Sequence, residues 1–147
     1  MWNKLVFAGL VVCVSLVAGC ASVDWAEEER DSALKAFPAP APGMAGLYLY
    51  RDTPLGFALK KKIYVDGVCL GRTKNKTFYY KEVTPGQHEV STESEFSDNK
   101  MTVQTEAGRN HFVEQFITMG VFVGQAYLKI VSEEEGMQHV RNCRLAE

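Results

Sequence analysis

The sequence predicts a mainly β protein, a small β-sandwich of seven or eight short strands with a short C-terminal helix. Short segments rich in β-branched and aromatic residues alternate with turn signals at close intervals. This pattern is typical of sandwiches and barrels rather than of βαβ units. Near the C terminus, Ser132 followed three residues later by Glu135 has the spacing of a capping box, which predicts the start of a helix.

Composition divides the chain into three parts, residues 1–19, 20–45 and 46–147. The first part has the composition of a secretory signal peptide, because Lys4 precedes a mostly apolar run and small residues follow it. The apolar run covers residues 5–17, which is shorter than the roughly 20 residues that a membrane-spanning helix needs. We therefore expect residues 1–19 to be removed.

The residues at the end of this signal, Val17-Ala18-Gly19-Cys20, resemble the lipobox of bacterial lipoproteins. The resemblance implies cleavage between Gly19 and Cys20 and attachment of lipid, including palmitate, to Cys20. A plain secreted protein and a membrane-spanning protein are the alternatives. Because Ala21 and Ser22 follow the cysteine in place of an aspartate, the expected location is the outer membrane, with the protein facing the periplasm.

Residues 20–45 are expected to form a lipidated tether. Asp24 and Glu27 have the spacing of an N-cap with an acidic partner, which predicts a short helix over Trp25–Phe37. Three prolines then alternate with alanines, and each proline favours an extended backbone. The sequence therefore predicts a semi-rigid spacer that holds the domain off the membrane.

The domain over residues 46–147 begins with Leu47–Tyr50, which is apolar on both faces and is therefore expected at the centre of a sheet. Asp66-Gly67 is a strong two-residue hairpin signal between two of the strands. Met101 and Val103 are expected to point inward. The remaining strands are expected at Ile63–Val65, Val68–Gly71, Phe78–Tyr80, Gln87–Val90, Met101–Gln104, His111–Ile117 and Gln125–Val131.

Two cysteines lie in the expected domain, Cys69 and Cys143. A bridge between them would close a loop of about 75 residues, which the chain-entropy model values at roughly 4–5 kcal/mol. Two separate buried thiols are the alternative, because pairing cannot be deduced from sequence. No Cys-x-x-Cys or spaced histidine pair is present, so neither a metal site nor a cofactor is expected.

Two motifs suggest a family. Ile63–Gly67 with Gly71, followed by Val83–Val90, resembles the small β-sandwich modules called PEGA domains. Together with the lipobox, Leu47–Arg51 and Ser91–Ser97, these motifs make the chain similar to a family of bacterial lipoproteins with a domain of unknown function, the 2846 type. That family has no established catalytic residues, so the resemblance implies no particular chemistry.

The charged residues offer little sign of catalysis. The formal net charge is −2 and no basic block is present, which argues against nucleic acid as a partner. His88 is expected to be a buried ring bonded to backbone. Glu93 and Glu95, if on a strand, point the same way and could form a glycosidase pair, although a solubilised strand edge is the commoner reason for such a run. We therefore expect no enzymatic activity.

Aromatic residues are abundant in the first half of the domain. They are expected to fill the core, with a docking surface for a partner or a glycan as the alternative. The sequence thus predicts a lipid-anchored cell-envelope protein with a non-catalytic periplasmic binding or structural domain, whose partner is an envelope protein. Binding of peptidoglycan or another glycan is the second hypothesis, and an envelope hydrolase is the third. The aromatic residues concerned are Tyr48, Tyr50, Tyr64, Phe78, Tyr79 and Tyr80.

Overall fold

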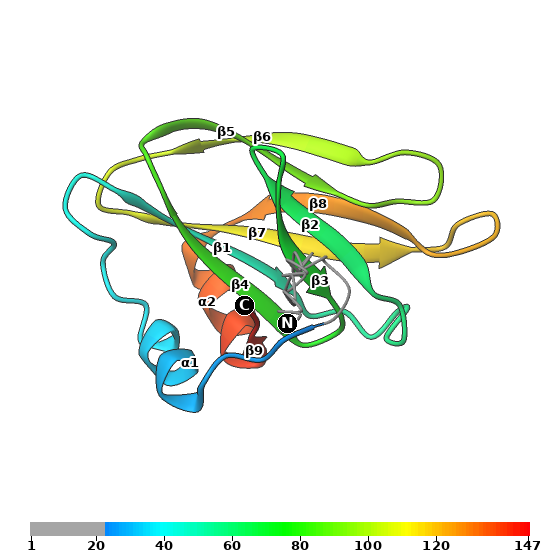
Figure 1. Cartoon of the computed structure of the whole chain (residues 1–147), viewed down its shortest axis with the longest axis horizontal. Helices are drawn as coiled ribbons and strands as arrows, with labels where there is room; N and C mark the ends of the chain where they lie inside the picture. Colours follow the sequence, from blue (N-terminus) through cyan, green and yellow to red (C-terminus); the bar gives the residue numbers. More distant parts are fainter. Residues whose placement is uncertain (1–22) are drawn as a thin grey trace, which may run out of the picture.

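The computed structural model describes residues 23–147 (Figure 1). The predicted signal peptide, its cleavage site at Gly19 and the predicted lipid attachment at Cys20 lie outside this range. The described part contains nine strands in two sheets and two short helices, which confirms the mainly β fold with a C-terminal helix. No helix within residues 23–147 is both long enough and apolar enough to cross a membrane.

Strand β1 lies at the centre of a five-stranded sheet and is buried along its whole length, as its two apolar faces predict. It pairs antiparallel with β4 and parallel with β7. The short β9 at one edge is the one strand of this sheet that the sequence pattern did not indicate. In sheet order the strands are β8 (Gln125–Val131), β7 (Asn110–Thr118), β1 (Ala45–Arg51), β4 (Thr77–Val83) and β9 (Arg144–Leu145).

The second sheet has four antiparallel strands. The predicted Asp66-Gly67 hairpin joins β2 to β3, with φ of 50° at Asp66 and 78° at Gly67. Two successive positive φ angles are what this type of tight turn requires, and glycine adopts them without a steric cost. In sheet order the strands are β3 (Val68–Thr73), β2 (Lys61–Val65), β5 (Gly86–Thr92) and β6 (Asn99–Thr105).

The two sheets enclose one apolar core. Because side chains alternate along a strand, Leu47 and Leu49 of β1 point into the space between the sheets. They meet Ile63 and Val65 from β2 in the facing sheet. Val103 is buried there and Met101 packs against the same cluster, which confirms the predicted inward face of β6.

A second core lies on the other face of the five-stranded sheet. The alternate residues of β1, Tyr48 and Tyr50, join Phe78 and Phe112 in this cluster. Helices α1 (Glu28–Lys35) and α2 (Glu133–Arg141) lie on this side of the sheet (Figure 1). Four of the six aromatic residues singled out in the sequence, Tyr48, Tyr50, Phe78 and Tyr79, are therefore core residues rather than a docking surface.

Helix α2 begins as its capping box predicts, with the Ser132 hydroxyl accepting a hydrogen bond from the Glu135 amide at 3.2 Å. Gly136, in the middle of the helix, lies directly against the Phe112 ring. The Cβ of any other residue there would overlap this ring. Gly136 weakens the helix locally, but it lets α2 approach the sheet closely.

The N-terminal segment does not form the predicted tether. Helix α1 begins at Glu28 with Glu27 as its N-cap, so the Asp24 cap is wrong. Trp25 forms a β-bridge with Ala146, and the Asp31 carboxylate accepts a hydrogen bond from the Leu145 amide at 2.6 Å. Residues 25–37 are thus part of the folded domain, because their apolar side chains complete the second core.

The proline-rich segment also packs on the domain rather than acting as a spacer. Pro40 is buried. The carbonyl of Pro38 accepts a hydrogen bond from the Asn110 side chain at 3.0 Å, and the Ala41 amide donates one to Glu82 at 2.8 Å. The segment has neither helix nor strand structure, as expected for proline, yet its polar backbone groups bind to the sheet.

The bridge between Cys69 and Cys143 that the sequence left open does not form, because Cys143 is a free, buried thiol. Cys143 belongs to the core beneath the helices, whereas Cys69 lies on β3 of the other sheet. The five-stranded sheet separates these two layers. Sequence spacing could not show on which side of that sheet the thiol of Cys143 would lie.

Candidate functional site: an apolar end of the sandwich

Three loops meet at one end of the sandwich, and they carry most of the exposed apolar side chains of the described residues. They are the β1–β2 loop (52–60), the β5–β6 loop (93–98) and the β7–β8 loop (119–124). The parallel strands β1 and β7 both run toward this end. Of the antiparallel pair, β2 begins at this end and β5 finishes there. We call it the apolar end, after its exposed residues Leu55, Phe57, Phe96, Met119, Val121 and Phe122.

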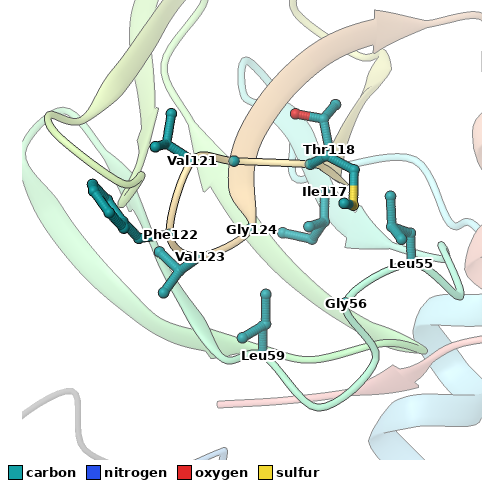
Figure 2. A pocket seen from close by; sticks show the side chains of 11 residues that line it. Leu55, Gly56, Leu59, Ile117, Thr118, Val121, Phe122, Val123 and Gly124 are labelled. Atoms are coloured by element: carbon teal, nitrogen blue, oxygen red, sulfur yellow. The ribbon is translucent and has the colours of Figure 1, made fainter.

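An open pocket of about 320 Å³ lies between the β1–β2 and β7–β8 loops (Figure 2). Leu55 and Leu59 from the β1–β2 loop face Ile117 of β7 and Val123 of the β7–β8 loop, while Phe122 projects away from the pocket. Thr118 provides the only polar side chain of the lining. A pocket of this composition suits hydrocarbon rather than a polar substrate.

The exposed side chains of the β7–β8 loop are large and uncharged. We call residues 119–124 of this loop the β7–β8 tip. Met119 and Phe122 are each 82% exposed, and the Phe122 ring meets the 71% exposed Phe96 ring at a centroid separation of 6.4 Å. Residues 117–125 contain no charged residue. A cluster of apolar side chains in water on this scale marks an interaction surface or a ligand site.

The Glu95 carboxylate holds the β7–β8 tip in place. It accepts hydrogen bonds from the amides of Val121 at 2.8 Å and Val123 at 3.3 Å, and from the amide of Phe122 between them. Desolvation opposes ionisation, but these hydrogen bonds outweigh it and lower the pKa of the Glu95 carboxyl. The carboxylate therefore satisfies three successive backbone donors in a loop that has no strand partner.

Glycines set the fine shape of this end. A Cβ at Gly120 would overlap the Val123 carbonyl oxygen and the Glu95 carboxylate. A Cβ at Gly124 would lie 2.5 Å from Leu59 Cδ1 and 2.8 Å from Ile117 Cγ2, nearer than real contacts allow. Only glycine at these two positions lets the tip fold back onto Glu95 and onto the β1–β2 loop.

Arg51 holds the β1–β2 loop in the same way as Glu95 holds the tip. The guanidinium is fully buried and donates hydrogen bonds to the carbonyls of Leu59, at 2.7 Å, and Gly56. Burial lowers the pKa of Arg51 to about 10, so the side chain keeps its charge at neutral pH. Two charged side chains therefore fix the two apolar loops that form the pocket.

A buried polar link underlies these loops and joins the two sheets. The Gln115 amide of β7 donates to the Thr92 hydroxyl of β5 at 2.6 Å. Thr73 of β3 donates to the Gln115 carbonyl oxygen and, at 3.1 Å, to the Lys61 carbonyl. Because paired polar groups in a core rigidify it, the apolar loops stand on a rigid base.

Trp25 of the N-terminal segment lies near the same end. Arg51, the last residue of β1, pairs with Thr77, and Thr77 pairs with Arg144 beside the bridge between Trp25 and Ala146. The Trp25 ring lies between two cations, with Lys74 Nζ at 4.8 Å from its centroid and the Arg144 guanidinium carbon at 5.1 Å.

His88 has the structural role that its position predicts, at the opposite end of the sandwich. Its Nε2 lies 2.7 Å from the Thr84 carbonyl, and its Nδ1 lies 2.6 Å from the Asp66 carboxylate. Burial lowers the pKa of His88, but these two hydrogen bonds outweigh burial and raise it overall. The arrangement joins two turns and leaves neither ring nitrogen available to a substrate.

The two candidate carboxylates do not form a catalytic pair. Glu93 and Glu95 lie in the β5–β6 loop rather than on a strand. Glu93 accepts a hydrogen bond from the Lys62 amide at 3.1 Å, while Glu95 is occupied by the β7–β8 tip. Each carboxylate therefore organises backbone, which is a different role from either of those that the sequence suggested.

A cysteine, a histidine and an aspartate lie near one another beneath α2, yet their geometry does not suit a nucleophile. His139 Nδ1 lies 2.8 Å from the Asp52 carboxylate. Cys143 instead directs its thiol to the Arg51 carbonyl at 3.7 Å, and burial raises its pKa to about 12. A thiolate is the reactive form of cysteine, so this site disfavours the reactive species.

Among residues 23–147 no group of three or more His, Cys, Asp or Glu side chains could hold a metal ion.

Sequence reasoning missed the apolar end. The strand pattern makes Met119–Gly124 a connection between two strands, and this connection contains two glycines, two valines, one methionine and one phenylalanine. Connections between strands are usually rich in polar turn residues. An uncharged apolar hairpin tip was the signal that could have pointed to a binding surface.

The fold and the site together define a two-sheet β protein, with helices on one face of the five-stranded sheet and an exposed apolar end. The chain belongs to the family described as "Protein of unknown function (DUF2846)", whose model matches residues 41–126. The matched range includes all three loops of the apolar end. The chain is also 41% identical over 139 residues to an uncharacterized protein of Haemophilus influenzae, which covers 95% of this chain and 83% of that protein. No solved structure matches the chain.

Proposed function

We propose that this protein is a lipid-anchored, non-catalytic component of the cell envelope that binds its partner through the apolar end. The observation that carries the proposal is a cluster of exposed apolar side chains on loops held by Arg51 and Glu95. Leaving such side chains in water has a cost, and a binding role gives a reason for it. Fixed loops also lose little entropy on binding, which favours affinity.

The envelope location rests on the residues before Cys20. The lipobox pattern supports a lipid anchor at this cysteine, with the outer membrane and its periplasmic face as the proposed destination. Replacing Cys20 by alanine is expected to change the mass of the processed protein and to shift it out of the membrane fraction. An unchanged mass and membrane fraction in the Cys20→Ala variant would refute the anchor.

Site-specific photo-cross-linking in living cells tests the binding surface. A benzophenone amino acid replaces Phe122 at the apolar end or, as the control, Val68, which is 56% exposed at the opposite end. We expect adducts, identified by mass spectrometry, from the Phe122 position and none from the Val68 position. Equal capture from both positions, or none from either, would contradict a binding role for the apolar end.

A further inference from the structure

We infer that the apolar end docks on the surface of a lipid bilayer, with the β7–β8 tip in the interfacial region. This inference rests on the proposed function and names the partner of the same surface. Three independent features support it: the length of chain between the proposed anchor and the domain, the side chains around the N-terminal segment, and the hydrogen bonding of the tip.

The first feature is the short distance that the chain can span between Cys20 and the fold. Val23 already packs against the core between the sheets. Three residues can span at most about 11 Å when fully extended. With no long tether, a lipid on Cys20 keeps the domain against the membrane. Trp25, two residues after Val23, lies beside Lys74 in the β3–β4 turn, which is at the end where the apolar loops lie.

The second feature is the set of side chains beside that segment. Trp25 is flanked by Lys74 and Arg144, and the exposed Lys60 is the last residue of the β1–β2 loop. Tryptophan prefers the membrane–water interface, and lysine and arginine reach from apolar surface to lipid headgroups. Basic side chains are also attracted to anionic lipids. Apolar loops beside tryptophan and basic residues match the order of a bilayer surface, in which acyl chains lie beneath the headgroup region.

The third feature is how the tip satisfies its backbone. An amide that leaves water without a partner carries a large penalty. At Val121, Phe122 and Val123 that penalty is avoided, because all three amides already donate to Glu95. The side chains of Met119, Val121 and Phe122 can then leave water while these amides keep their hydrogen bonds.

Fluorescence in vesicles tests this inference on the full-length protein. Phe122→Trp and the control Val68→Trp are reconstituted into vesicles of phosphatidylethanolamine with a minority of phosphatidylglycerol, with and without bromine on the acyl chains. Both positions are exposed in the fold, so neither substitution disturbs the core. Subtracting the wild-type signal removes the contribution of the native tryptophans.

We expect the added fluorescence of Phe122→Trp to shift to the blue and to be largely quenched by brominated lipid, while that of Val68→Trp stays red and unquenched. Unquenched emission from Phe122→Trp, equal to that of Val68→Trp, would overturn the inference. If cross-linking at the Phe122 position then captures one defined envelope protein, the proposed function stands with a protein partner. If cross-linking captures nothing, the proposed function fails as well.

Discussion

The close contact between Gly136 and Phe112 allows a prediction in which two effects oppose each other. Alanine has the higher helix propensity and would stabilise an interior helical position by about 1 kcal/mol over glycine. Here, however, the new methyl group would overlap the ring of Phe112. That ring is 1% exposed and is stacked on Tyr48 at a centroid distance of 4.9 Å, with Phe37 on its edge at 5.9 Å. The ring is therefore buried and packed on both a face and an edge.

We expect the destabilisation from the steric overlap to exceed the stabilisation from the higher helix propensity of alanine. Overpacking a well-filled core typically costs about 1–3 kcal/mol. After the gain in propensity of about 1 kcal/mol is subtracted, Gly136→Ala should lower the free energy of unfolding by up to about 2 kcal/mol. Urea unfolding of the purified full-length protein, followed by circular dichroism and linear extrapolation, measures this change. Gln138→Ala, at an exposed position of the same helix, is the control for propensity alone and should change little.

A double mutant shows whether the ring causes the loss. Phe112→Leu shortens the side chain that faces Gly136 and is destabilising by itself. In that background Gly136→Ala should cost little or even stabilise, so the two changes should couple strongly. If Gly136→Ala stabilises the protein with Phe112 intact, the ring can yield and the reasoning about packing is refuted.

Three further predictions concern single side chains. Because the pKa of His88 is raised in the folded state, the stabilisation from its pairing with Asp66 is complete below about pH 6.5 and is lost as the pH rises through the folded pKa. The midpoint of urea unfolding should therefore fall as the pH rises over this range. Asp66→Asn should abolish this dependence of the midpoint on pH. Glu95→Gln should accelerate hydrogen exchange of the tip amides, whereas Glu93→Gln should not; equal exchange in both variants would contradict the role of Glu95. Cys143, with its pKa raised to about 12, should resist maleimide in the folded protein and react after denaturation, and rapid labelling of native protein would show that the site opens.

Local pattern was sufficient for most of the secondary structure. Leu47–Tyr50 predicted a central strand because apolar residues occupied both of its faces, and the structure covers both faces. Asp66-Gly67 predicted its hairpin because few other pairs accept two positive φ angles. Ser132 and Glu135 predicted the start of α2 because the capping contact lies within one turn. In each case the interaction that decides the structure lies within a few residues.

The same local reasoning failed where distant segments meet. Trp25 pairs with Ala146 at the far end of the chain, and nothing near Trp25 in sequence indicates that partner. Strand β9 has two residues and depends on β4 for its existence. Glu95 resembles a solubilising charge until the β7–β8 tip brings its amides to the carboxylate.

For this protein the sequence by itself determined the mainly β class, eight of the nine strands of the described residues, the C-terminal helix and the pattern that supports a lipid anchor at Cys20. Only the tertiary structure decided which face of the central sheet holds Cys143, that residues 25–37 belong to the domain, and that three loops form one apolar end. Periodicity and turn chemistry are short-range properties of a chain. The order of strands in two sheets is a long-range packing result, and that order determines which loops share an end of the sandwich.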